Sequence, residues 1–117
     1  MKKLLFLFIS VILLNSCSSD KILPEKSVST LYNEAMDFVK EESYDKAIES
    51  FQEVERQHPY SPWAAKAQIM TAYLYYKQPK YDDAILAINR FLSLHPGNKY
   101  APYALYLKGM CYYEQVT

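Results

Sequence analysis

The chain has 117 residues, with 13 basic and 13 acidic side chains and 50% hydrophobic residues. This length suits one globular domain at most, and the balanced charge with only 2 Gly argues against a nucleic-acid-binding patch or a disordered tail. Aromatic residues make up 15% of the chain, and 12 of them are Tyr. A Tyr excess of this size needs an explanation.

Residues 1–16 are predicted to be a secretory signal peptide that is not part of the fold. Two lysines near the start precede an apolar run from Leu4 to Leu14, which is too short to span a bilayer because a spanning helix takes about 20 residues. The segment Leu14-Asn15-Ser16-Cys17 then resembles the lipobox of bacterial lipoproteins, although Asn15 departs from the small apolar residue usual there. The alternative is an ordinary signal peptide followed by an incidental Cys.

The lipobox resemblance implies an S-diacylglycerol and an N-palmitoyl group on Cys17, and no other cofactor is expected. Such lipid anchors bind a membrane firmly, since each buried CH₂ contributes roughly 0.8 kcal/mol. Ser18 stands where Asp would resemble the signal for retention in the inner membrane, so the expected location is the periplasmic face of the outer membrane. Residues 17–27 are expected to be a lipidated tether. If Cys17 is lipidated, Cys111 has no disulfide partner and is predicted to be a small buried hydrophobe.

The rest of the chain repeats itself at an offset of 37 residues. The segment Tyr44-Asp45-Lys46-Ala47-Ile48 matches Tyr81-Asp82-Asp83-Ala84-Ile85, and His58-Pro59 matches His95-Pro96. Because several matches share this one offset, chance does not explain them. The chain is therefore predicted to contain a repeat domain at 28–117, with units near 28–64, 65–101 and 102–117, of which the last is incomplete.

Each unit is predicted to be a pair of helices. Apolar residues recur at helical spacing, with breaks near Ser43 in the first unit and at Gln78-Pro79 in the second. Pro59 and Pro96 end the pairs, because the residue before a proline avoids the helical region, and Pro62 and Pro102 lie near the starts of the following helices. The apolar stripes are Leu31, Ala35 and Phe38, then Ala47, Phe51 and Val54, then Ala84, Ile88 and Phe91.

These units resemble the tetratricopeptide repeat, whose usual period is 34 residues. Small residues at Ala35, Ala72 and Gly109 stand where two helices approach closely, and large residues such as Phe38, Tyr75 and Tyr112 fill the space between helices. The resemblance implies an all-α fold of helical hairpins stacked as a right-handed superhelix, with two full units plus the first helix of a third. Because such arrays need about three units and a capping element, the chain is expected to be part of a longer protein.

The first helix of each pair is expected to line the inner face of the superhelix, which places six of the 12 Tyr there. Tyr combines apolar area with a hydrogen-bonding tip, Met adapts to varied partners, and Lys can receive a carboxylate, so this face is predicted to be a peptide-binding groove. The alternative is that these Tyr side chains only pack between repeats. The predicted groove consists of Tyr32, Met36, Lys40, Lys66, Ile69, Tyr73, Tyr76, Lys77, Tyr103, Tyr106 and Tyr113.

Catalysis and metal binding are not expected. His58 and His95 hold the same position in successive units, at a helix C-terminus where a partial positive charge is favourable, so a structural role is the better interpretation. The sequence contains no nucleophile–base pair, phosphate-binding loop or cluster of metal ligands. An exported enzyme that uses the groove as an active site is therefore the disfavoured alternative.

The lipobox, the repeats and the segment Gln57-His58-Pro59-Tyr60-Ser61-Pro62-Trp63 together resemble the BamD (ComL) family, the D subunits of the β-barrel assembly machinery. The stretches 72–77, 87–96 and 106–110 are also similar to that family, with Lys108 where Arg is usual. The resemblance covers the front half of the family only. An alternative with the same lipobox and repeats is a tetratricopeptide pilotin or assembly lipoprotein of a secretin or type IV pilus.

The BamD resemblance implies a non-catalytic outer-membrane lipoprotein whose front repeats receive unfolded outer-membrane proteins. The barrel-forming insertase, accessory lipoproteins and the membrane itself are its further implied partners, and no nucleic acid is expected. Outer-membrane β-barrels have alternating strands with aromatic girdles, and a chain that ends in such a strand offers an aromatic residue beside a free carboxylate. A Tyr groove with Lys nearby is complementary to this end, and Tyr73, Tyr76 and Tyr113 are expected to contact it.

Overall fold

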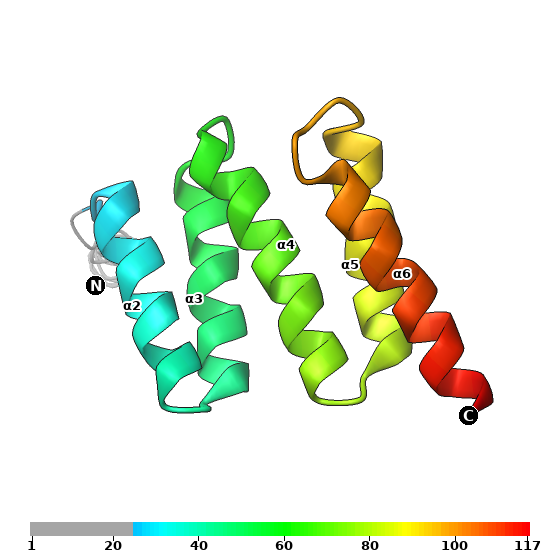
Figure 1. Ribbon diagram of the computed structural model, residues 1–117. Coiled ribbons are helices and arrows are strands. Elements are labelled where there is room, and N and C mark those ends of the chain that lie inside the picture. The colour runs from blue at the N-terminus through cyan, green and yellow to red at the C-terminus, as the bar shows by residue number, and fades with distance from the viewer. Residues whose placement is uncertain (1–24) are drawn as a thin grey trace, which may run out of the picture.

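The computed structural model describes residues 25–117, and this part of the chain is entirely helical apart from turns (Figure 1). The predicted signal peptide, Cys17 and most of the predicted tether lie outside the described residues. The helices are α2 (Val28–Lys40), α3 (Tyr44–Gln57), α4 (Pro62–Lys77), α5 (Tyr81–Leu94) and α6 (Ala101–Val116).

The helices pack in chain order, each antiparallel to the next, so that α2–α3 and α4–α5 form two hairpins and α6 lies against α5 (Figure 1). In addition α2 contacts α4, and α4 contacts α6. The first helices of the units therefore lie side by side along one face. The predicted all-α fold of successive helical hairpins is confirmed, whereas the right-handed superhelix stays a prediction.

Local sequence accounts for the helix boundaries. The Ser27 and Ser61 hydroxyls accept hydrogen bonds at 3.3 Å from the backbone N–H groups of Thr30 and Ala64 in the first turns of α2 and α4. Pro62 occupies the first turn of α4, where a missing N–H has no cost. Helices α3 and α5 both end shortly before a proline, as predicted.

The 37-residue repeat extends to backbone geometry at the two histidines. His58 caps α3 with φ −131° and ψ 58°, and His95 caps α5 with φ −134° and ψ 57°. Their N–H groups donate to the carbonyls of Val54 at 2.9 Å and Phe91 at 2.8 Å. Equivalent histidines therefore form equivalent turns, which agrees with a structural role.

His58 also contacts the segment that precedes α2. Its Nε2 donates to the Lys26 carbonyl oxygen at 3.0 Å, and its Nδ1 lies 3.8 Å from a Glu25 carboxylate oxygen. This contact joins the N-terminal end of the described chain to the C-terminal end of α3.

The core contains the predicted stripes. Ala35, Ala47 and Ala84 are fully buried between helices, and the rings of Phe51 and Phe91 fill the space beside them with no exposed surface. Phe51 belongs to a cluster built by α2, α3 and α4, and Phe91 belongs to a second cluster built by α4, α5 and α6. Both clusters include side chains of α4, so this helix joins the two hairpins.

The third unit contains only its first helix, as predicted. A Cβ at Gly109 would meet no atom within 4 Å, and the side chain of Tyr112 is 52% exposed. Among residues 25–117, no helix covers this side of α6. A role of these two residues in a helix–helix contact therefore stays a prediction. None of the described helices is both long enough and apolar enough to cross a membrane.

Replacing Phe51 by Ala should lower the free energy of unfolding by about 3–5 kcal/mol, because a fully buried ring leaves a cavity. Urea denaturation followed by far-ultraviolet circular dichroism measures the change. Leu94→Ala is the matched control, since Leu94 is 54% exposed and its loss should stay within about 0.5 kcal/mol. Equal losses in the two variants would contradict the assigned core.

Candidate functional site

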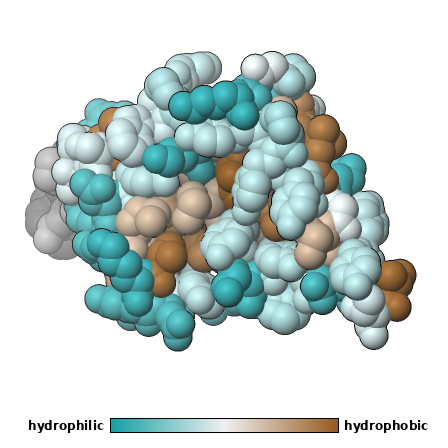
Figure 2. Space-filling model, viewed as in Figure 1, coloured by the Kyte–Doolittle hydropathy of each residue, from teal (hydrophilic) through white to brown (hydrophobic). Residues whose placement is uncertain are grey.

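A cavity of about 520 Å³ opens on the face formed by the first helices of the units, between α4 and the start of α6. This volume lies within the range of small-molecule and peptide side-chain pockets, about 300–1,000 Å³. We call it the inner groove. Next to this cavity, between α2 and α4, Figure 2 shows a patch of apolar residues on the same face, with more hydrophilic residues around it. The groove is lined by Lys66, Ile69, Met70, Tyr73, Tyr100 and Tyr103.

Helix α4 supplies one wall because four of its residues, spaced over two turns from Lys66 to Tyr73, point to the same side. The opposite wall comes from Tyr100, just before α6, and from Tyr103 in its first turn. The walls are aliphatic and aromatic, and Lys66 is the charged member of the set.

Lys66 is held over two aromatic rings. Its Nζ lies 5.0 Å from the ring centroid of Tyr32 and 5.4 Å from that of Trp63, and the two rings are themselves 4.8 Å apart. Lys66 forms no ion pair with any residue of the described range. The ammonium group is therefore fixed in position while its charge stays available to an anionic ligand.

Two tyrosines on this face, Tyr103 and Tyr32, have raised pKa values. Burial raises the pKa of Tyr103, and the neighbouring hydroxyls of Tyr73, Tyr106 and Tyr76 raise it further. Burial likewise raises the pKa of Tyr32, with a smaller contribution from Tyr100. At neutral pH the Tyr103 hydroxyl is therefore protonated, so it can both donate and accept hydrogen bonds, and it lines the same cavity as the positively charged Lys66.

Four of the eleven predicted groove residues line the cavity together: Lys66, Ile69, Tyr73 and Tyr103. Three further tyrosines extend the aromatic surface beyond it. The half-buried Tyr76 has its ring 5.8 Å from that of Tyr81, while Tyr106 is 62% and Tyr113 60% exposed on α6.

The other four predicted residues lie elsewhere. Tyr32 is 6% exposed and packs edge-on against Phe51 at 5.3 Å, so most of its ring belongs to the core. Met36 is half-buried against the same cluster. Lys40 and Lys77 are exposed in the last turns of α2 and α4, away from the cavity. Peptide binding by any of the eleven stays a prediction.

Sequence reasoning missed Met70, Tyr100 and Trp63. Tyr100 precedes α6, so a register based on helix positions did not include it. A signal was nevertheless present, because the 37-residue offset relates Trp63 to Tyr100 and places an aromatic side chain near both inter-repeat turns.

Cys111 is fully buried, as predicted, and burial raises the pKa of its thiol. A protonated thiol in the core is a poor nucleophile. Within residues 25–117 no three His, Cys, Asp or Glu side chains come together in a way that could hold a metal ion.

Comparison with known proteins places this chain among lipoproteins. Residues 24–117 match the family YfiO, described as outer membrane lipoprotein. A stretch of 55 residues, 47% of the chain, is 43% identical to the outer membrane protein assembly factor BamD of Caulobacter vibrioides. The matched stretch spans 18% of the length of that relative.

The cation–π contact of Lys66 with Trp63 should be measurable as a coupling of about 0.5–1 kcal/mol in a double-mutant cycle of Lys66→Met and Trp63→Leu. Urea denaturation supplies the four free energies of unfolding. A cycle of Lys77→Met with Trp63→Leu is the control and should show no coupling, because Lys77 is exposed at the far end of α4. Additive effects in the first cycle would contradict the geometry.

Proposed function

Since the chain belongs to the YfiO family of outer membrane lipoproteins, we propose that it is a lipid-anchored component of the β-barrel assembly machinery. In this role it is a non-catalytic scaffold that binds unfolded outer-membrane proteins. Its further partners are the barrel-forming insertase and the accessory lipoproteins. The match to an assembly factor supports this role over that of a pilotin for a secretin or type IV pilus.

The observation that carries the proposal is the inner groove, which joins an aromatic cavity to one available cation. A β-barrel segment that ends in an aromatic residue brings a ring and a carboxylate to the same place. The ring would lie between Tyr73 and Tyr103, and the carboxylate would pair with the Lys66 ammonium. The Tyr hydroxyls would hydrogen-bond to the peptide backbone of the bound segment.

The groove has a rigid wall, which limits the entropy lost on binding. Ile69 is 5% exposed and is anchored in the second core cluster, and Tyr73 packs against both clusters. Tyr106 and Tyr113 continue the aromatic surface along α6 for a longer extended segment. Their exposure keeps the affinity modest, which suits a protein that must release its client.

A labelled peptide that ends in Phe should bind the full-length lipoprotein in detergent micelles. The double variant Tyr73→Ala/Tyr103→Ala should lower the affinity by about tenfold or more, which is equivalent to about 1.4 kcal/mol. Fluorescence anisotropy measures the affinity. Lys66→Met should weaken binding of the free acid but not of the amidated peptide, because only the former carries a carboxylate.

Tyr60→Ala is the matched control for this experiment, since Tyr60 is fully exposed in the turn before α4 and lies outside the groove. The control should bind like the wild type. If the wild type and the double Tyr variant bind the peptide with equal affinity, the inner groove is not the binding site.

The proposed anchor is tested by Cys17→Ala, which should abolish incorporation of labelled palmitate and move the protein out of the membrane fraction. Cys111→Ser is the control and should retain the label, because Cys111 is buried in the core. On sucrose gradients the wild type should sediment with the outer membrane. Palmitate uptake by the Cys17→Ala variant would refute the assignment.

A further inference from the structure

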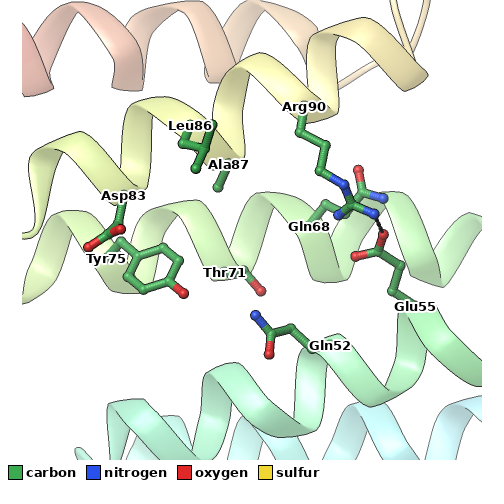
Figure 3. Close-up of a pocket in the computed structure, with 9 residues that line it drawn as sticks. All are labelled: Gln52, Glu55, Gln68, Thr71, Tyr75, Asp83, Leu86, Ala87 and Arg90. Atoms are coloured by element: carbon green, nitrogen blue, oxygen red, sulfur yellow. Dashed lines mark hydrogen bonds and ion pairs between the residues drawn. The ribbon is translucent and has the colours of Figure 1, made fainter.

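A second cavity, of about 180 Å³, lies on the opposite side of α4 from the inner groove (Figure 3). The helices α3 and α5 form its walls and α4 forms its floor. We call it the outer pocket. Gln68, Thr71 and Tyr75 of α4 line it, whereas Lys66, Ile69 and Tyr73 line the groove, so the two sites use opposite faces of one helix.

The floor of the outer pocket is polar at a position where the repeat uses an apolar residue. Gln68 and Thr71 are 7% and 8% exposed, and they are the buried polar side chains of the described chain. The 37-residue offset relates Gln68 to Leu31, which is 4% exposed in the first core cluster. The second unit therefore has an amide where the first unit packs with Leu.

The amide oxygen of Gln68 is not satisfied by any of residues 25–117. Its Oε1 is buried and has no hydrogen-bond partner in the described range. An unpaired buried amide destabilises the fold, and a Leu of similar size would avoid this cost. A residue that breaks the packing rule of its own repeat points to a functional requirement at that place.

The walls give the outer pocket a net negative charge. Arg90 of α5 pairs with Glu55 of α3 at one end, which neutralises that carboxylate (Figure 3). Asp83 lies at the other end, near Tyr75, and forms no ion pair with another described residue (Figure 3). The exposed carboxylate of Asp83 favours a cationic ligand at its end of the pocket, and the Thr71 hydroxyl and the Gln68 amide oxygen, farther along the floor, can accept hydrogen bonds (Figure 3).

The rim beside these polar groups is apolar. Leu86 lines the pocket and is 70% exposed, and Ala87 lies next to it. A lysine side chain matches this arrangement because it combines an aliphatic stem with a three-donor ammonium group. The volume of the cavity suits one such side chain rather than a whole peptide.

We propose that the outer pocket is a docking site for a partner-protein segment that inserts a lysine side chain and places an adjacent apolar residue on Leu86. The ammonium group pairs with Asp83, and the Thr71 hydroxyl and the Gln68 amide oxygen, farther along the floor, accept hydrogen bonds from backbone N–H groups of the same segment. Because the outer pocket and the inner groove lie on opposite faces, the two sites can be occupied together.

The test uses the full-length lipoprotein, labelled with ¹⁵N, in detergent micelles. N-acetyl-Lys-Leu-amide is the probe, and the resonances of the Gln68 and Gln52 side-chain amides report on the pocket. The lysine probe should shift these resonances, with an affinity roughly fivefold or more above that of N-acetyl-norleucine-Leu-amide, which lacks the charge. Equal or tighter binding of the norleucine probe, or of N-acetyl-Glu-Leu-amide, would overturn the proposal.

Two variants separate a docking role from a structural one. Gln68→Leu should raise the Tm, because it installs the residue of the equivalent position in the first unit, and it should abolish the shift at Gln52. Asp83→Asn should lower the affinity for the lysine probe by roughly fivefold. Asp82→Asn is the control and should leave this affinity unchanged, because Asp82 is exposed and lies outside the pocket. A lower Tm for Gln68→Leu, or equal effects of the two Asp variants, would make the pocket a structural feature only.

Discussion

The close approach of paired helices at fully buried alanines is the constraint on which the rest of the structure depends. Ala35 and Ala47 let α2 and α3 meet, and Ala72 and Ala84 do the same for α4 and α5. Because Ala fills so little space, the large rings must lie beside the contact rather than within it. This arrangement places Phe51 and Phe91 in the core, whereas Tyr103, Tyr106 and Tyr113 stay partly exposed on α6.

Helix α4 is the element on which this constraint acts most strongly. It contacts α3 and α5 directly and also reaches α2 and α6, so every side of it is occupied by protein or by a cavity. Its inner side carries Lys66 and Tyr73, and its outer side carries Gln68 and Thr71. A helix anchored by two core clusters holds both sets of side chains in fixed positions.

The features that depend on local periodicity could be predicted from the sequence, and those that depend on neighbouring units could not. The stripe through Phe51 and the helix ends at proline result from spacing along one segment. Tyr32 belongs to the core because Trp63 and Lys66, both in the first two turns of α4, cover its ring. Gln68 looks like an ordinary polar helix residue in the sequence, and only the packing of α3 and α5 buries it.

Trp63 is the single tryptophan of the chain and lies at the border between the first core cluster and the Lys66 ammonium. The emission of an indole depends on nearby charge and on access of water, and both would change when a carboxylate reaches Lys66 or a ring enters the cavity beside it. The protein therefore contains its own optical reporter of events on the inner face. Changes on the outer side of α4 should leave that emission untouched, so one unlabelled protein can distinguish occupation of the two faces.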